Sequence, residues 1–490
     1  MPEQKDLELL IHGHTPILQI ETHEEKRALD LLVRIATQNV IPLFKWSVTE
    51  GLRRVDIDLG VQRHNAEPRD VLGHIKSSDV DGIYVLLDFD PYIQEPVNQR
   101  YIKEIAMQFE GGRNKLVFIS HKVDMPPGLA KRVARFELRL PDASALEHII
   151  RDEAGRWQKE SGKRVATDAD TLQRLMRNLS GLTFNDARRL VRNVIVDDGA
   201  ITEEDLPEVM RAKYQLLNRD DVLSFEFETT RFSEVGGMRT LKRWLQQREK
   251  IFHGLIDQPG IDTPRGVLLL GVQGCGKSLA AKAIAGIWKV PLLRFDFGAL
   301  YDKYIGESEK NLRESLKTAE VMAPCVMWID EIEKGIASGN DDGTSRRILG
   351  SLLTWLAENR SSVFIVATAN NIDDLPPELI RKGRLDEIFF VDLPKQDIRK
   401  QIFSIHMGKR QVDPSAIDLE TLAAASEGFS GSEIEQAVVS AIYSNYGSDR
   451  PMTTQSLLKE IRATRPLSVV MDAQIQKLKQ WAESRTVPVD

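Results

Sequence analysis

Residues 266–278 read Gly266-Val-Leu-Leu-Leu-Gly-Val-Gln-Gly-Cys-Gly-Lys-Ser278, and this stretch decides the fold. Its apolar half, Val267–Leu270, is typical of a buried parallel strand, and the residues after Ser278 favour a helix. The glycines between them let the backbone wrap closely, so that its N–H groups and the helix N-terminus point at an anion. The pattern G-x-x-x-x-G-K-S predicts a phosphate cradle, in which Lys277 reaches the outer phosphates and the Ser278 hydroxyl ligates Mg²⁺.

An apolar strand that ends in two carboxylates follows downstream, in the run Val326-Met-Trp-Ile-Asp330-Glu331. Asp330 suits the second shell of Mg²⁺, and Glu331 suits a base that activates the attacking water. Acidic residues at strand ends also serve as helix N-caps. Adjacent Asp and Glu after four apolar residues, downstream of a phosphate cradle, favour the chemical interpretation, and together the two motifs predict hydrolysis of ATP bound with Mg²⁺.

Two later segments carry further polar candidates. Val363–Asn370 is predicted to be another strand, and the Asn370 amide at its C-terminal end can orient the water between Glu331 and the γ-phosphate. Downstream, Arg381 and Arg384 stand three residues apart around a glycine. Taken alone, two such arginines are more often solvated surface residues.

Residues of about 225–465 resemble the AAA-type module of the AAA+ superfamily, because five motifs occur in the family's order. Phe232–Gly237 resembles the segment whose backbone lies beside the adenine, Gly271–Ser278 is similar to the Walker A loop, and Val326–Glu331 is similar to Walker B. Asn370 stands where the family has its first sensor. Gly428–Ile434 resembles part of the helical lid.

The resemblance implies an α/β P-loop fold, with a parallel five-stranded sheet sandwiched by helices at residues 229–395. A small helical lid and a C-terminal helix would occupy residues 396–490. It also implies that the nucleotide is contacted by Gly271, Val272, Gln273, Gly274, Cys275, Gly276, Lys277, Ser278, Leu279, Val235 and Gly236, and that Ser278 and Asp330 form the metal site. The family usually has two prolines at positions 272 and 273 and a threonine at 275, but the cradle binds phosphate mainly through its backbone.

Arg381 and Arg384 match the family's arginine-finger motif, which acts on the ATP of a neighbouring subunit. The resemblance therefore implies a homo-oligomeric ring, usually a hexamer, and assigns catalysis to Glu331, Asn370, Arg381, Arg384 and Lys277. Leu300–Glu309 resembles the first pore loop, in which Lys303, Tyr304 and Ile305 would grip a polypeptide through contact area alone. The alternative is that Tyr304 is a packed aromatic residue at the foot of the next helix.

The first half of the chain echoes the second, which indicates an internal repeat. Gly82–Asp88 echoes Cys325–Asp330, and Leu116–His121 echoes Val363–Ala369. No Gly-Lys-Ser follows the first predicted strand, and Phe89 stands where the base would be. Residues 1–200 are therefore predicted to be a degenerate AAA-like or RecA-like α/β domain without Walker A, joined by a linker at 201–228. An unrelated α/β domain is the alternative.

The plan of an inactive N-terminal domain followed by one AAA module is similar to a family found in cyanobacteria and some algal plastid genomes. The leading functional hypothesis is an ATP-driven remodeller that threads a protein substrate through its pore. The alternative is a slow ATP-dependent switch that recruits partners without threading. The only His-Glu pair, His23-Glu24, lacks the second histidine of a zinc protease, so no protease is predicted.

Composition narrows the remaining possibilities. The 490 residues suffice for about three domains, and 42% hydrophobic with 28% charged residues is typical of a globular protein. A net charge of −7 makes nucleic acid an unlikely partner. Two cysteines, Cys275 and Cys325, do not make a disulfide scaffold, and no apolar run approaches a membrane span. We therefore expect a cytoplasmic protein with no membrane partner.

Overall fold

The computed structural model describes residues 2–55, 65–217, 222–226, 232–256, 260–301, 308–337, 343–381, 383–446 and 452–490. The chain separates into two compact units. One unit comprises Met1–Glu153 with Leu182–Val191, and the other comprises Ala154–Gly181 with Arg192–Asp490. The pore-loop candidates Lys303, Tyr304 and Ile305 lie outside the described residues.

The first unit is a three-layer α/β domain. Its strands are β1 (Ile17–Glu21), β2 (Leu43–Ser47), β3 (Gly51–Arg54), β4 (Ile83–Leu87), β5 (Lys115–Ser120) and β6 (Val133–Phe136). Its helices are α1 (Pro2–His12), α2 (Glu25–Gln38), α3 (Pro68–Ser77), α4 (Asp90–Ile93), α5 (Pro96–Phe109) and the 3-10 helix η1 (Pro127–Arg132). The strands β4 and β5 are buried along their whole length, because α1 and α2 cover one face of the sheet and α3 and α5 cover the other.

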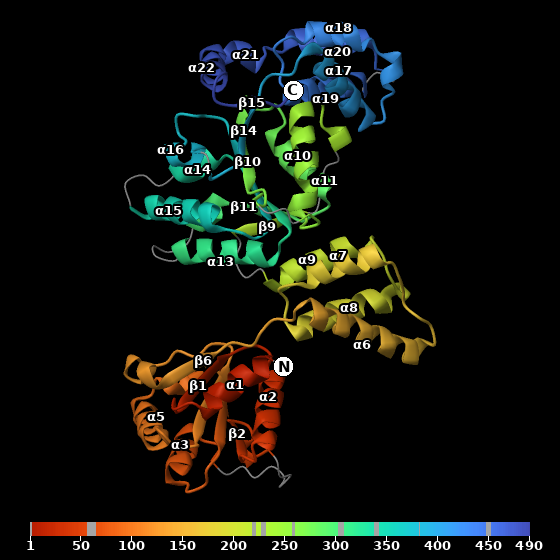
Figure 1. The fold of residues 1–490 in the computed structure, drawn as a ribbon. Coiled ribbons are helices and arrows are strands. Elements are labelled where there is room, and N and C mark those ends of the chain that lie inside the picture. Colours follow the sequence, from red (N-terminus) through yellow and green to blue (C-terminus); the bar gives the residue numbers. More distant parts are fainter. Residues whose placement is uncertain are drawn as a thin grey trace. The chain divides into compact units, whose positions relative to one another are not determined.

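A helical segment follows in the chain, and its helices α6 and α8 each contribute residues to both units (Figure 1). Its elements are α6 (Ala143–Ser161), β7 (Ala166–Thr167), α7 (Ala169–Leu179), α8 (Phe184–Asp198), β8 (Ala200–Ile201) and α9 (Asp205–Leu217). The fully buried Lys213 of α9 donates a hydrogen bond to Ser180 O at 2.6 Å. Burial lowers the pKa of Lys213 to about 8.

The second unit contains a larger sheet. Its strands are β9 (Leu223–Glu226), β10 (Gly266–Gly271), β11 (Leu292–Phe295), β12 (Cys325–Ile329), β13 (Val363–Ala369), β14 (Glu387–Val391) and β15 (Val487–Pro488). The helices around it are η2 (Phe232–Glu234), α10 (Arg239–Phe252), α11 (Lys277–Trp288), α12 (Phe297–Tyr301), α13 (Ser308–Val321), α14 (Ile332–Ala337), α15 (Gly343–Glu358) and α16 (Pro377–Ile380). The strand order is β15-β14-β10-β13-β12-β11-β9, and the five inner strands are parallel, as predicted.

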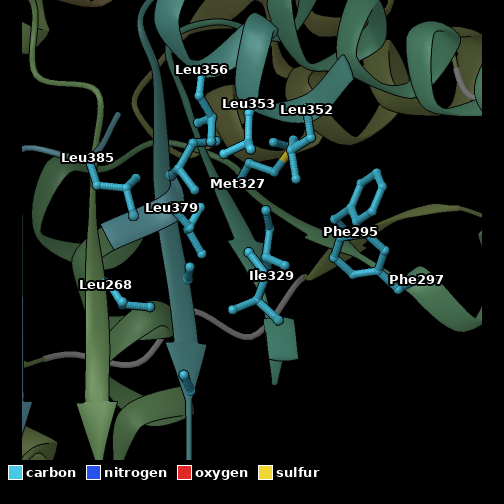
Figure 2. Packing of buried hydrophobic residues seen from close by; sticks show 14 of the residues in the cluster. Leu268, Phe295, Phe297, Met327, Ile329, Leu352, Leu353, Leu356, Leu379 and Leu385 are labelled. Carbon is cyan, nitrogen blue, oxygen red and sulfur yellow. The ribbon is translucent and has the colours of Figure 1, made fainter. Parts of the chain in front are cut away.

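Helices cover both faces of this sheet, and a layer of buried apolar side chains lies between the sheet and the helices on each face. On one face α10 and α11 pack with Val267, Leu269 and Phe364. On the other face α13 and α15 pack with the alternate strand residues. Figure 2 shows this second layer, where Leu352, Leu353 and Leu356 of α15 lie above Met327 and Ile329 of β12. The alternation follows from the period of two along a strand.

The lid is a separate helical core, built from α17 (Gln396–Gly408), the 3-10 helix η3 (Pro414–Ala416), α18 (Leu419–Ala425), α19 (Gly431–Tyr446) and α20 (Thr454–Ala463). After it come α21 (Leu467–Val470) and α22 (Asp472–Ala482). Leu478 and Ala482 of α22 join the core of the large sheet. In the described part of the chain, no helix combines the length and the apolar character that a membrane span requires.

Two predicted boundaries differ from the structure. The expected linker 201–228 contains α9 and the antiparallel edge strand β9, which pairs with β11 because Val222 and Leu223 bury apolar side chains against the sheet. The expected lid 396–490 includes β15, which extends the sheet beside β14. Both edge strands are too short to show a period that could be recognised in the sequence.

The two sheets share one topology. When β3 is left out of the first sheet, and β9 and β15 out of the second, the strand orders are β2-β4-β5-β1-β6 and β11-β12-β13-β10-β14. If the five strands of each set are numbered along the chain, both orders are 2-3-4-1-5. Each also carries an antiparallel strand beside its second strand, β3 in one and β9 in the other. The first strand pairs with the fourth 99 residues later in both cases, as Ile17 with Leu116 and as Gly266 with Ile365.

Candidate nucleotide site

The predicted phosphate cradle lies between the end of β10 and the start of α11. Gly274 has a φ of +76°, and a Cβ there would lie 2.2 Å from Ser432 Oγ of α19. The backbone N–H of Ser432 donates to Gly274 O at 3.0 Å. The loop therefore needs a glycine at this position, both for its left-handed conformation and for close contact with the lid.

Lys277 is the first residue of α11, and its side chain lies in the loop. Its Nζ donates to the carbonyls of Gly271 and Val272 at 2.8 and 2.9 Å. Burial lowers the pKa of Lys277 to about 8, although Glu333, Asp330 and Glu331 act in the opposite direction. Gly271 and Val272, both predicted to contact the nucleotide, are not among the described residues that line the cavity, and instead hold this ammonium group.

The predicted metal residues meet at the end of β12. Ser278 Oγ lies 3.2 Å from Asp330 Oδ1, which also accepts a hydrogen bond of 2.6 Å from Thr368 Oγ1. A hydroxyl and a carboxylate are the oxygen donors that Mg²⁺ prefers, so these residues fit the ion. Ser278 and Asp330 would hold Mg²⁺, which neutralises phosphate charge when bound. Thr368 was not predicted from the sequence, because threonine in a β-strand carries no functional signal.

Glu331, the predicted base, is the next residue after Asp330. It has a φ of +47°, and its backbone N–H donates to Thr368 Oγ1 at 2.9 Å. The side-chain amide of Asn370 donates to Glu331 Oε1, and Lys334 Nζ lies 2.5 Å from Glu331 Oε2. Asn370 thus orients one oxygen of the Glu331 carboxylate, and Lys334 orients the other.

A buried carboxylate, Glu333, was not predicted from the sequence. Its Oε1 accepts a hydrogen bond of 2.8 Å from the backbone N–H of Asn370, and the residue is 3% exposed. Burial raises the pKa of Glu333. It lies on α14 one turn after Asp330, and only the pairing of β12 with β13 brings it to Asn370.

A cavity of about 530 Å³ joins these groups to the lid. Residues 273–279, Val235 and Gly236 lie on its wall, as do Asp330, Glu331 and Asn370. The lid contributes Gly431 and Ser432 of α19, which belong to the predicted lid segment Gly428–Ile434. It also adds residues that were not predicted, namely Ile402, Ile405 and His406 of α17, Lys409 directly after α17, and Glu435 of α19. Burial lowers the pKa of His406, whose Nδ1 lies 3.4 Å from Glu435 Oε1.

Three family models match the chain in order. The AAA model, "ATPase family associated with various cellular activities", matches residues 267–393. The N-terminal and second domains of SpoVK-like AAA ATPases match residues 3–138 and 144–220. The chain is 35% identical to the "Uncharacterized AAA domain-containing protein ycf46" of Guillardia theta, over 98% of this chain and 95% of that protein.

The chain belongs to the ycf46 family of AAA ATPases.

A protein of the same name from Pyropia yezoensis is 34% identical over 98% of this chain and 97% of its own length. The "Proteasome-activating nucleotidase" of Aeropyrum pernix is 34% identical over 47% of this chain and 59% of that protein. The predicted AAA fold and ATP hydrolysis are confirmed by these matches. The N-terminal domain matches the corresponding domain of SpoVK-like AAA ATPases, and its AAA-like character stays a prediction that the shared strand order supports.

The predicted arginine fingers lie away from this AAA module's own cavity. Arg381 is exposed at the end of α16, and Arg384 donates a hydrogen bond to Leu353 O of α15. Neither is among the described residues that line the cavity. The geometry therefore does not bring them together with Glu331 and Asn370 within one chain.

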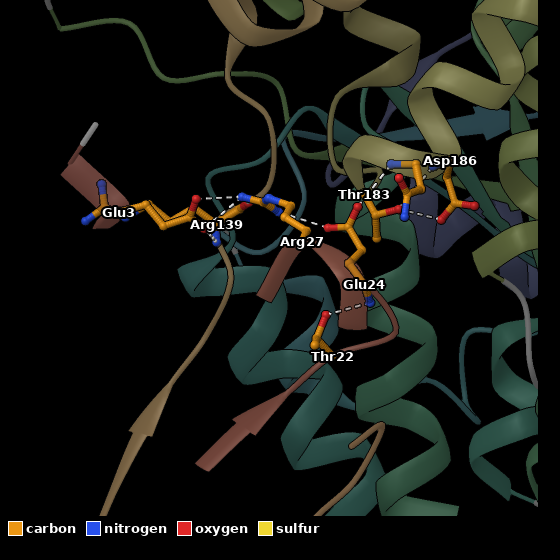
Figure 3. Close-up of polar contacts among 8 residues, drawn as sticks. Glu3, Thr22, Glu24, Arg27, Arg139, Thr183 and Asp186 are labelled. Atoms are coloured by element: carbon orange, nitrogen blue, oxygen red, sulfur yellow. Dashed lines mark hydrogen bonds and ion pairs between the residues drawn. The ribbon is translucent and has the colours of Figure 1, made fainter. Parts of the chain in front are cut away.

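In the N-terminal AAA-like domain, ion pairs fill the corresponding place. Helix α2 of this domain corresponds to α11 of the AAA module, and it begins with Glu25, whereas α11 begins with Lys277. Glu24 Oε1 accepts a hydrogen bond of 3.0 Å from Asn185 N, and its other oxygen accepts one of 2.9 Å from Arg27. Figure 3 shows that Arg27 also reaches Glu3, 2.7 Å away. Glu24 thus bonds to the first turn of α8 and not to the N–H groups of α2, and its negative charge at the start of α2 disfavours a phosphate there.

The predicted base position of this domain is also occupied by a core residue. Phe89, which follows Asp88, is 1% exposed and packs against Trp46 and Phe118. An apolar ring cannot activate water. The described residues of this domain therefore contain neither a free phosphate cradle nor a base next to Asp88.

Proposed function

We propose that this AAA ATPase works as a homo-oligomeric ring, in which hydrolysis of Mg²⁺-bound ATP drives the remodelling of a protein substrate. Lys277 and the loop before it hold the phosphates, while Ser278 and Asp330 hold the ion. Glu331 activates the water that Asn370 orients. Arg381 and Arg384 act on the nucleotide of the neighbouring subunit.

One observation supports the proposal that the active enzyme is an oligomer. Phosphoryl transfer is accelerated by about 10³–10⁵ when a guanidinium group stabilises the transition-state charge. No arginine lines the cavity among the residues that the structure describes, and its second cation, Lys409, is paired with Glu234 at 2.9 Å. The exposed Arg381 is available to a site in another copy.

Mixing two inactive variants tests this directly. Lys277→Ala subunits lose their own site but keep Arg381, and Arg381→Ala subunits keep the cradle and the base. If the arginine acts between subunits, a 1:1 mixture regains about a quarter of the wild-type rate under random assembly, because a heterologous interface places each site beside a neighbour's arginine. A mixture of Lys277→Ala with Glu331→Gln is the control and stays inactive, since no site in it is complete.

Two results would contradict the action of Arg381 between subunits. One is full activity of Arg381→Ala alone. The other is a mixture that stays inactive while the solution mass of Glu331→Gln with ATP and Mg²⁺ remains at 55.4 kDa. A rise in that mass to about six times the chain mass supports a hexamer.

The threading step rests on the resemblance of Lys303, Tyr304 and Ile305 to a pore loop and on the similarity to a protein named for activating a proteasome. Tyr304→Ala is expected to keep basal ATP hydrolysis and to abolish the remodelling of an unfolded test protein. Tyr301→Ala, a change in the preceding helix, is the control variant. If Tyr304→Ala remodels like the wild type, the chain instead acts as a switch that recruits partners without threading.

A further inference from the structure

Residues 487–490 return from α22 to the AAA sheet and pack beside the nucleotide site. Val487 and Pro488 pair with Phe389 and Phe390 of β14. Val489 N donates to Phe390 O at 3.2 Å, and Val489 O accepts from Thr240 N at 2.9 Å. The Val489 side chain is 6% exposed and belongs to the core shared with α10 and α11. This segment is therefore built into the sheet edge.

Asp490 then lies against the backbone that precedes α10. Its Oδ1 accepts a hydrogen bond of 3.1 Å from Arg239 N and lies 3.6 Å from Arg239 Nε. Gly237 has a φ of +69°, and a Cβ at that position would lie 2.5 Å from Asp490 Oδ2. The carboxylate thus occupies the space that a side chain at residue 237 would need.

The backbone that Asp490 contacts is also a wall of the nucleotide cavity. Val235, Gly236 and Met238 line that cavity. Lys242 Nζ donates to Val235 O at 3.2 Å. Asp490 acts on the pKa of this same lysine, raising it against the effect of burial. Asp490 is therefore linked to both ends of the segment 235–238.

The lid holds the same segment from a second direction. Gln401 Oε1 accepts a hydrogen bond of 3.2 Å from Gly237 N, and Asp397 lies 3.2 Å from Arg239. Arg239 is thus shared between Asp397 of α17 and Asp490. A shift of the lid helix and a shift of residues 487–490 would both act on this one arginine.

We propose that Asp490 is a positioning residue for ATP binding, which acts through Gly237 and Arg239 to hold residues 235–238 in the shape that receives the nucleotide base. Removing its carboxylate leaves the phosphate cradle intact, because the cradle is held by Lys277 and by α19. The effect therefore falls on ligands that carry a base and not on a bare phosphate chain. The inference rests on the ATPase activity and is independent of the oligomer and of threading.

The test compares Asp490→Ala with Asp490→Asn in the full chain. For Asp490→Ala we expect the KM and Kd for ATP to rise about three- to tenfold, as for the loss of one ordinary hydrogen bond, with kcat nearly unchanged. The Kd of inorganic tripolyphosphate, measured by competition with Mg²⁺ present, stays at the wild-type value. Asp490→Asn keeps an acceptor for Arg239 N and recovers most of the ATP affinity. Asp472→Ala removes an exposed carboxylate of α22 and is the matched control.

Two outcomes would overturn the proposal. One is an unchanged ATP affinity in Asp490→Ala. The other is an equal loss of affinity for ATP and for tripolyphosphate together with a lower Tm, which would mean that Asp490 only stabilises the sheet edge. Combining Asp490→Ala with Arg239→Ala adds a second measurement. Arg239→Ala keeps the backbone N–H that donates to Asp490, so the non-additive part of the double variant measures the contribution of the Arg239 side chain.

Discussion

The side-chain amide of Asn370 donates a hydrogen bond of 2.8 Å to Glu331 Oε1, while the backbone N–H of Asn370 donates to Glu333 Oε1 at the same distance. One asparagine at the end of β13 therefore connects the base to a buried carboxylate on the following helix. The base is oriented by the neighbouring strand as well as by its own. This arrangement separates the roles of the two glutamates and allows each to be tested.

Removing the Asn370 amide should lower kcat and leave nucleotide binding nearly unchanged. Asn370→Ala frees Glu331 Oε1, and misplacing a general base typically costs about 10²-fold in rate. Steady-state ATPase rates and fluorescent-nucleotide binding measure the two effects. Asn371→Ala is the control, because this exposed neighbour bonds to Asp374 instead. A Kd that changes as much as kcat would show that Asn370 binds the nucleotide rather than orienting the base.

We expect Glu333→Gln to fold nearly as stably as the wild type and Glu333→Ala to be destabilised. Glu333→Gln keeps an acceptor for the Asn370 N–H, whereas Glu333→Ala leaves a buried donor unsatisfied at about 1–3 kcal/mol. Burial raises the pKa of Glu333, so its contribution to stability is complete below the ordinary pKa and is lost as pH rises through the raised value. We therefore expect Glu333→Gln to lose less Tm than the wild type between pH 5 and pH 7.5. A parallel loss in both proteins would contradict this account.

ATP affinity should fall as pH rises above about 8. Burial lowers the pKa of Lys277 to about 8, so the nucleotide-free protein loses this charge above that value, and a phosphate restores it by favouring the ammonium form. Binding should therefore take up a proton between about pH 8 and pH 10. Calorimetry in two buffers of different ionisation enthalpy measures that proton. Identical heats in both buffers at pH 9 would exclude the uptake.

The chain should bind one nucleotide. The N-terminal AAA-like domain fills its own cradle position with Glu24 and Arg27, so Lys277→Ala is expected to abolish all binding of ATP and ADP. Calorimetric stoichiometry should be about one site per chain for the wild type, with no binding measurable for the variant. Glu24→Ala serves as the companion variant, and we expect it to lower Tm without adding a second site. Residual binding in Lys277→Ala would place a nucleotide in the first domain.

The parts that could be predicted from the sequence are those in which the relevant residues lie together in one continuous segment. The strand, glycine loop and helix around Lys277 are contiguous, and the carboxylates Asp330 and Glu331 follow an apolar run. Asn370 could be placed because parallel strands end at one edge of the sheet. The likeness between the halves was visible in the strand residues, since those residues are buried in both sheets.

The parts that could not be predicted depend on contacts between distant segments. Glu333 resembles any acidic helix residue until β13 brings Asn370 to it. His406 and Glu435 reach the cavity only because α17 and α19 pack together. The two-residue strand β15 has no period of its own, and Gly271 and Val272 orient Lys277 instead of lining the cavity.

The strand order shared by the two sheets also sets the timing of folding. In each sheet the first strand lies between the fourth and the fifth, so β1 and β10 have no partner until about a hundred residues more have been synthesised. The apolar strand that carries the ATP loop is consequently exposed on the nascent chain for longer than any other strand of its sheet. Unpaired apolar segments are prone to aggregate, so synthesis of this chain passes through two such intervals, one for each sheet, and the second ends when β13 arrives.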